Sequence, residues 1–308
     1  MEISEAISRL REAGVNVTPT GPDTVRTDDG VPMLVRKLAK APGRRTVEHD
    51  LSRTEDHLLL YILGTTPRKL DRLTSDPRVA VVSPGAIWYG KDLTETPAMA
   101  TKAIGRGPRP YTKFAVARAL LAPERLPQTM LAARFHVSQP AVSNAVAKLA
   151  DEVPPRTTGD DHGALFDYAL TRYPGPGGIT TYWWRDDPLD QQAATILEAD
   201  AGALLSGDLA ARQISAWRVP EHATVYTVNE LNPAALGFAA ATADDYTLSI
   251  TVPADTTLWA TSKLHHRPGT ADPVIVAHDI LNTGTTGDQD EAAGMIRAAT
   301  LRLLPEQR

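Results

Sequence analysis

The sequence predicts a multidomain α+β protein, with a small α/β domain, a helical domain in the middle and a second α/β domain at the C-terminus. Three observations predict this class. The 308 residues correspond to two domains or three small ones, at roughly 150 residues per average domain. Strand-like apolar runs alternate with segments of helical periodicity on both sides of a purely helical centre. Residues 92–110 lack periodicity and contain three prolines and two glycines, which is typical of a linker. We expect domains at 1–96, 97–162 and 163–308.

The composition excludes several classes of protein. There is no cysteine, which excludes disulfides, thiolate catalysis and cysteine-ligated zinc. No apolar run approaches the ~18–20 residues of a membrane span. The first residues form a polar amphipathic pattern that includes acids, unlike a signal peptide. We expect a cytoplasmic protein without membrane contact.

The N-terminal domain is predicted to be a small sheet with one or two helices. Ile3, Ala6, Ile7 and Leu10 recur at helical spacing, and Gly14 is a natural helix end. The apolar run LLLYIL is too short for a helix, so we expect a strand buried on both faces. The predicted strands are 15–18, 23–27, 33–38, 58–63, 79–82 and 86–89, and a further helix is predicted at 66–73.

Charge is distributed unevenly along the chain. Residues 97–156 hold nine basic and three acidic residues, a net charge of +6. Residues 1–96 are neutral and residues 157–308 have a net charge of −11. A basic segment between a neutral and an acidic one is expected of a nucleic-acid-binding module, although sixty residues can also reach +6 by chance.

The segment 128–149 has the apolar pattern of a helix-turn-helix. The first helix is expected to bury Leu131, Ala132 and Phe135, and the turn to bury Val137. The second helix is expected to bury one apolar face, formed by Val142, Ala145 or Val146, and Leu149. Ser138 is a good N-cap and Pro140 falls in the first turn. His136 stands where such turns tend to need a left-handed backbone, which histidine tolerates better than a branched residue does.

The second helix, at about 139–149, is therefore predicted to enter the major groove of DNA. Glutamine and asparagine can pair bidentately with adenine, and serine can bond several base edges. We expect base contacts from Gln139, Ser143 and Asn144, and phosphate contacts from Lys148 and Thr129. The full set of predicted DNA-binding residues is Thr129, Ser138, Gln139, Ser143, Asn144, Lys148, Arg156 and Lys113.

Two flanking segments complete this prediction. Residues 151–159 form either a wing, whose Arg156 reaches DNA, or a simple exit loop. Residues 111–121 supply the leading helix, with Phe114, Val116, Ala117, Leu120 and Leu121 inward, and Lys113 and Arg118 outward.

In the C-terminal domain we expect helices at 164–171, 189–201 and 288–304, and strands at 179–184, 223–228, 246–252 and 257–261.

The segment LAARFHVSQPAVSNAVAKL resembles the helix-turn-helix of bacterial transcription regulators; the alternative is a helical hairpin without a DNA role. Together with segments 205–211, 217–220, 224–226, 272–281 and 290–293, it resembles the AbiEi-like (type IV antitoxin) regulators of actinobacteria. That resemblance implies a central winged helix-turn-helix and a C-terminal domain similar to a nucleotidyltransferase fold. It also implies repression of the protein's own operon.

Catalysis is not expected in either flanking domain. A nucleotidyltransferase holds two magnesium ions with carboxylates that alternate along one strand, and 224–228 carries none. The N-terminal layout resembles a degenerate restriction-endonuclease core, in which Val35, Arg36 and Lys37 would occupy the metal-binding triplet, and valine cannot bind a metal. The pair His265 and His266 is expected in an exposed loop. We expect no enzyme activity, no metal and no cofactor.

The preferred hypothesis is a sequence-specific double-stranded DNA-binding transcription regulator, associated with the nucleoid. A homodimer is expected, because one small module buries too little surface to discriminate well. A small-molecule effector or a toxin is a further expected partner. The alternative hypothesis is an antitoxin-like protein that binds a partner toxin through its acidic C-terminal domain and autoregulates its operon.

Overall fold

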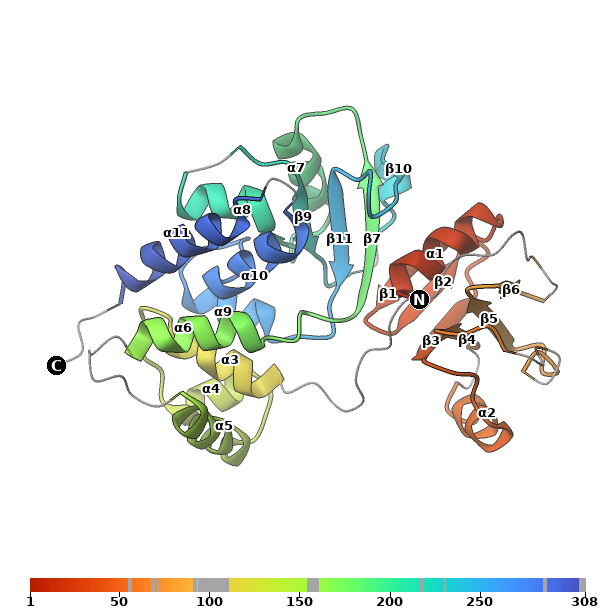
Figure 1. Ribbon diagram of the computed structural model, residues 1–308, viewed down its shortest axis with the longest axis horizontal. Helices are drawn as coiled ribbons and strands as arrows, with labels where there is room; N and C mark the ends of the chain where they lie inside the picture. The colour runs from red at the N-terminus through yellow and green to blue at the C-terminus, as the bar shows by residue number, and fades with distance from the viewer. Residues whose placement is uncertain are drawn as a thin grey trace.

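The structure is a computed structural model, and Figure 1 shows it as a mixed α/β molecule with two sheets. It describes residues 1–54, 57–67, 70, 73–90, 93, 111–153, 161–216, 219–229, 231–284 and 287–304. We call the described residues up to 93 the N-terminal lobe and those from 111 to 304 the main body. The mixed composition agrees with the predicted α+β class.

The N-terminal lobe is built on a six-stranded sheet in the order β1-β2-β3-β4-β5-β6. Strands β3, β4 and β5 are parallel, and the other neighbours are antiparallel. The elements are α1 (Ile3–Glu12), β1 (Val17–Gly21), β2 (Thr24–Thr27), β3 (Pro32–Leu38), α2 (Arg44–Leu51), β4 (Leu58–Leu63), β5 (Val79–Ser83) and β6 (Ala86–Trp88).

Two apolar layers cover the faces of this sheet. Helix α1 buries Ala6, Ile7 and Leu10, as its periodicity predicted, and Gly14 follows it with a positive φ of 82°. Strand β4 is buried on both faces from Leu59 to Leu63, which confirms the reading of its continuous apolar run. Helix α2 was not predicted, because only Val47 and Leu51 of its eight residues are apolar and pack on the sheet.

The main body begins with three helices and continues into the second sheet. The helices α3, α4 and α5 lie at the lower edge of the view in Figure 1. The elements are α3 (Tyr111–Leu120), α4 (Gln128–Arg134), α5 (Gln139–Glu152), α6 (Asp161–Arg172), β7 (Ile179–Trp184), α7 (Leu189–Ala199), β8 (Leu204–Ser206), α8 (Gly207–Ile214), β9 (Ala223–Tyr226), η2 (Pro233–Leu236), β10 (Ala239–Ala240), β11 (Leu248–Val252), α9 (Leu258–Leu264), α10 (Pro273–Thr283) and α11 (Gln289–Leu301).

The second sheet has the order β10-β7-β11-β9-β8. Only β11 and β9 are parallel, and the other pairs are antiparallel. Most expected elements of this region are present, but the expected strand at 257–261 is wrong. These residues belong largely to helix α9, in which Leu258, Thr261 and Leu264 lie on the buried side at helical spacing. Helices α8 and α10 and strand β8 were not predicted.

One apolar core runs through the whole main body. The same cluster of buried side chains contains Phe114 of α3, Leu149 of α5, Val225 of β9 and Ile296 of α11. The helix-turn-helix and the second sheet therefore share a single core.

The two lobes meet where α1 packs beside β7. The guanidinium carbon of Arg11 lies 4.7 Å from the ring centroid of Trp183, within the range of a cation–π contact. Ile179 of β7 joins the apolar cluster of the N-terminal lobe. Among the described residues, no helix has both the length and the apolar content that a membrane span requires.

Candidate nucleic-acid interface

Helices α4 and α5 are joined by a short turn in the segment for which the sequence predicted a helix-turn-helix. Leu131, Ala132 and Phe135 of the first helix segment are buried, and so are Val142, Ala145 and Leu149 of the second. The sequence did not decide whether Ala145 or Val146 is buried in this face; Ala145 is buried and Val146 is only half-buried. Helix α3 packs against α5 and supports its apolar face, so that the opposite face of α5 is directed away from the core.

The turn between the two helices has the backbone that the sequence predicted. His136 has a φ of 53°, in the left-handed region, and its side chain is exposed. The backbone N–H of Val137 donates to the carbonyl of Ala132 and closes the turn. Ser138 then caps α5, because its side chain accepts a hydrogen bond from the N–H of Ala141 at 3.3 Å.

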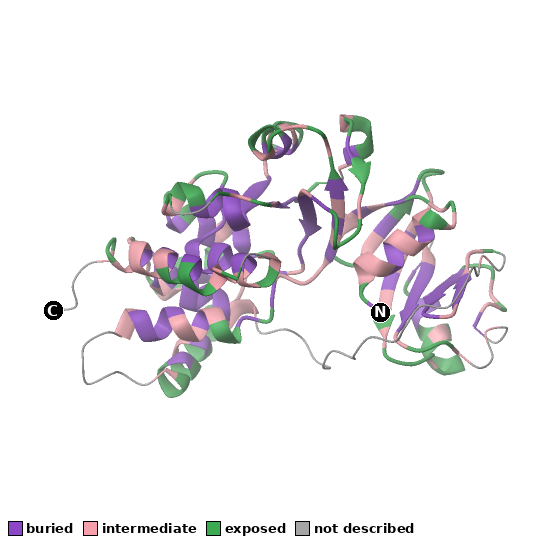
Figure 2. Ribbon diagram, turned by 45° about the horizontal axis from the view of Figure 1, so that its top comes forward, coloured by how far each residue is buried: buried purple, intermediate pink, exposed green. Residues whose placement is uncertain are grey.

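The outward face of α5 is polar and open. Gln139, Ser143, Asn144 and Lys148 are all exposed, and Figure 2 shows the exposed residues of α5 along the outer edge of the molecule. Thr129, at the start of α4, is also exposed. The Nε2 group of Gln139 donates to Oε1 of Gln128 at 3.2 Å, which links the beginnings of the two helices. We call Thr129, Gln139, Ser143, Asn144 and Lys148 the reading face.

Lys113 does not belong to the reading face. Its Nζ lies 2.8 Å from Glu152 Oε2 and 2.7 Å from the hydroxyl of Tyr168. Desolvation acts to lower the pKa of Lys113, but the hydrogen bonds to Glu152 and Tyr168 outweigh it and raise that pKa. Its ammonium ties α3 to the end of α5 and to α6. This contact holds the C-terminal end of α5 in place. The prediction that the Lys113 side chain points outward is therefore wrong.

Arg118 is also turned inward, and its predicted outward position is wrong. Its side chain is 1% exposed. Its Nη2 donates to Asp255 Oδ2 at 3.0 Å and to Thr257 Oγ1 at 2.7 Å, and its Nη1 lies 3.6 Å from Asp272 Oδ2. Burial alone would lower the pKa of Arg118, but the two carboxylates raise it, so the guanidinium stays charged.

The surroundings of Arg118 join elements that are distant in the sequence. Tyr173, at the end of α6, donates its hydroxyl to Asp255 at 2.8 Å, and Asp272 is the N-cap of α10. Each carboxylate thus has several donors, which compensates for its removal from water. Helical periodicity placed Arg118 among the polar positions of α3, but it could not reveal partners that lie 137 and 154 positions further along the chain.

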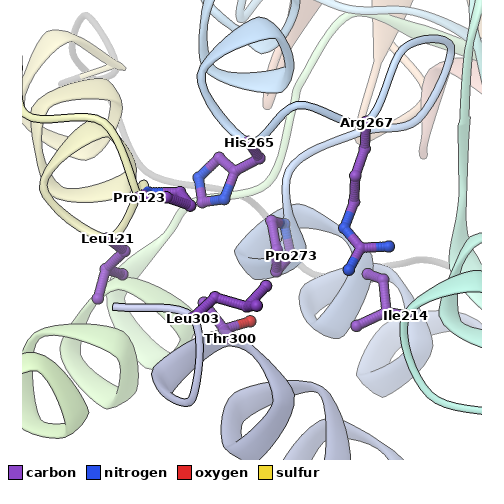
Figure 3. Close-up of a pocket in the computed structure, with 8 residues that line it drawn as sticks. All are labelled: Leu121, Pro123, Ile214, His265, Arg267, Pro273, Thr300 and Leu303. Atoms are coloured by element: carbon purple, nitrogen blue, oxygen red, sulfur yellow. The ribbon is translucent and has the colours of Figure 1, made fainter. Parts of the chain in front are cut away.

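His265 lies at the same junction, and its expected position in an exposed loop is also wrong. It is 8% exposed, and its Nε2 is 3.2 Å from the backbone oxygen of Arg118. Burial lowers the pKa of His265. Figure 3 shows this imidazole beside Pro123, above a cavity of about 10 Å³ that Thr300 and Leu303 close from the other side. Such a cavity holds one water molecule at most and is no ligand site.

In strand β3, the residues at the positions of the endonuclease metal-binding triplet, Val35, Arg36 and Lys37, pack in the core or pair with nearby carboxylates. Val35 is buried in the core of the lobe. Arg36 lies 3.9 Å from Asp23 and 4.0 Å from Asp50, and Lys37 forms a 2.6 Å ion pair with Glu2. Among the described residues, no group of three or more histidine, aspartate or glutamate side chains is placed to hold a metal ion.

Residues 154–160, which include Arg156 and most of the predicted wing, lie outside the described residues. Asp151 and Glu152, which the sequence placed in the wing, belong to the last turn of α5.

No protein-family model matches the chain, and no significant similarity was found to a curated protein or to a solved structure.

Proposed function

We propose that the protein is a sequence-specific, double-stranded DNA-binding transcription regulator that reads the major groove with α5, residues 139–149. The observation that carries this proposal is the reading face. Four polar side chains project from one side of a helix whose other side is buried against α3 and α4. Helices α3 and α4 lie on the inner side of α5, and the described main body does not cover the outer side (Figure 1).

The chemistry of the reading face suits base recognition. A major groove about 12 Å wide accepts a single α-helix, and an asparagine or glutamine side chain can bond both N6 and N7 of adenine. Gln139 and Ser143 lie in the N-terminal half of α5, the part of a recognition helix that usually meets base edges. We assign Thr129 and Lys148 to the phosphates that flank the groove, because their hydroxyl and ammonium groups suit phosphate oxygens.

The finer architecture belongs to the same proposal. The turn at Ser206 and Gly207, between β8 and α8, supports a nucleotidyltransferase-like fold. Strand β9 carries no carboxylate that could bind a metal ion, which supports a non-catalytic form of that fold. A homodimer on two half-sites would supply the surface that one reading face lacks. The resemblance to AbiEi-like regulators supports control of the protein's own operon.

The test is selection of bound duplexes from a random pool by the full-length protein. We expect enrichment of one sequence, with two related half-sites about one helical turn apart. The selected duplex should bind at least about a thousand times more tightly than random duplex at physiological salt. A control protein with Gln139→Ala, Ser143→Ala and Asn144→Ala together should enrich no sequence. Enrichment of the same sequence by parent and control, or of none by the parent, would overturn the proposal.

A further inference from the structure

The N-terminal lobe carries a second group of exposed cations. Residues 36–53 contain six basic and two acidic residues, a net charge of +4. We call Lys40, Arg44, Arg45 and Arg53 the basic surface. Lys40 lies just after β3, Arg44 and Arg45 begin α2, and Arg53 follows α2, so the whole set lies around one short helix. All four are exposed.

Among the described residues of this segment, both carboxylates, those of Glu48 and Asp50, already have partners. Glu48 lies 2.7 Å from Arg44, one helical turn away, and so it is already paired. Asp50 is buried, where it accepts a hydrogen bond from Tyr61 at 2.8 Å and lies near Arg36. Within the described part of the chain, Lys40, Arg45 and Arg53 form no ion pair. Three solvated cations on one surface attract a polyanion.

The basic surface lies on the same side of the molecule as the reading face. Helices α2 and α5 both lie at the lower edge in Figure 1, and the same two regions remain at the lower edge after the 45° turn of Figure 2. The contact of Arg11 with Trp183, and the place of Ile179 in the core of the N-terminal lobe, hold the lobes together. Strand β10 and helix α7, from the acidic C-terminal half, lie at the upper edge of Figure 1.

We propose that the basic surface is a second contact with DNA, in which Lys40, Arg45 and Arg53 bind backbone phosphates beside the base pairs that α5 reads. This inference rests on the proposed function and deepens it, because it assigns the N-terminal lobe to the same duplex. Mobile side chains on an exposed helix suit phosphates, whose spacing does not depend on sequence. The contact therefore adds affinity and dependence on salt, but no choice of sequence.

The experiment compares two duplexes that share the selected site. The short duplex contains only the selected base pairs, and the long one extends by about 15 base pairs, roughly one and a half helical turns, on each side. Binding is titrated by fluorescence anisotropy at several salt concentrations. The variant carries Lys40→Ala, Arg45→Ala and Arg53→Ala together. On the long duplex we expect its plot of log affinity against log salt to flatten by about two to three units, since each lost phosphate contact removes about 0.9. On the short duplex we expect the parent and the variant to have the same salt slope.

A matched control removes three exposed cations of the main body, with Arg172→Ala, Lys263→Ala and Arg302→Ala, and changes the net charge by the same amount. This control should keep the parent's slope on both duplexes. If the control flattens the slope as much as the variant, or if the variant keeps the parent's slope on the long duplex, the second contact does not exist, although α5 can still read DNA. If the parent prefers no sequence, the proposed function fails, and this inference fails with it.

Discussion

Asn144 and Lys148 lie one turn apart on the exposed face of α5, but their side chains have different chemistry. An amide has a donor and an acceptor in fixed positions, so that it can distinguish one base from another. An ammonium is a point charge that attracts any phosphate. Although both residues share the face, they should contribute different properties to binding.

We therefore expect Asn144→Ala to weaken binding to the selected duplex by about 1–3 kcal/mol and to leave random duplex almost unaffected. Lys148→Ala should weaken both duplexes alike and flatten the salt slope by about one unit. Anisotropy titrations with both duplexes measure this contrast. Glu198→Ala, an exposed change on α7, is the control. Parent-like binding by Asn144→Ala and Lys148→Ala would show that these roles are misassigned.

His265 predicts a dependence of stability on pH. Burial lowers its pKa, so the folded protein keeps the imidazole neutral where the unfolded chain, with a pKa near 6.5, binds a proton. The unfolded state is therefore favoured as the pH falls below about 6.5. Between pH 7.5 and 5.5 this residue should remove up to about 1.4 kcal/mol from the free energy of unfolding. Urea unfolding of the parent and of His265→Gln at both pH values measures the difference. An equal loss in the two proteins would contradict the role of His265.

At the scale of elements, the turn before α5 depends on one backbone conformation. His136 has a φ of 53°, which costs most L-residues about 1–2 kcal/mol. Its side chain is exposed, so we expect the backbone conformation to decide which residues the turn accepts.

We expect His136→Gly to change the free energy of unfolding by less than about 1 kcal/mol, since relief of strain and the greater freedom of the unfolded chain offset each other. His136→Val should destabilise the protein by about 1–2 kcal/mol, because a β-branched side chain fits this region poorly. Thermal unfolding of the parent, His136→Gly and His136→Val measures their order of stability. A valine variant as stable as the parent would mean that the turn relaxes without cost.

The sequence was most informative where short-range periodicity and burial coincide. Leu131, Phe135, Val142 and Leu149 repeat at helical spacing, and they are buried as predicted. Periodicity was misleading near Leu258, because a short run of β-forming residues next to a turn suits either a strand or a helix until its neighbours are known. It could not identify the partners of Arg118 at all, since Asp255 and Asp272 approach α3 only in the folded chain.

At the scale of the whole molecule, a single apolar core of the main body encloses a buried charge cluster around Arg118. Arg118 of α3 is enclosed by Asp255 and Asp272 from the C-terminal part of the chain. Removing the cation would leave two carboxylates buried without their main partner. The loss of one partner from a buried ion pair typically costs about 3–5 kcal/mol.

We accordingly expect Arg118→Ala to lower the free energy of unfolding of the main body by about 3–5 kcal/mol and to lower its unfolding temperature. In the Trp88→Phe background, whose remaining tryptophans all lie at or after residue 183, tryptophan fluorescence and helical circular dichroism should report one shared transition, because helices and sheet draw on the same core. Arg134→Ala, at an exposed position of α4, should change stability by less than about 0.5 kcal/mol. An Arg118→Ala variant as stable as the parent would show that the cluster does not support the fold.

The ionic attachment of α3 also limits how the protein can evolve and be engineered. Helix α3, which buries an arginine among the carboxylates of another region, cannot be exchanged together with α4 and α5 for the corresponding segment of an unrelated protein, because the graft would leave Asp255 and Asp272 without a counter-ion. Under the proposed function, new sequence preferences would therefore have to arise by substitution on the outer surface of α5, while its scaffold stays unchanged.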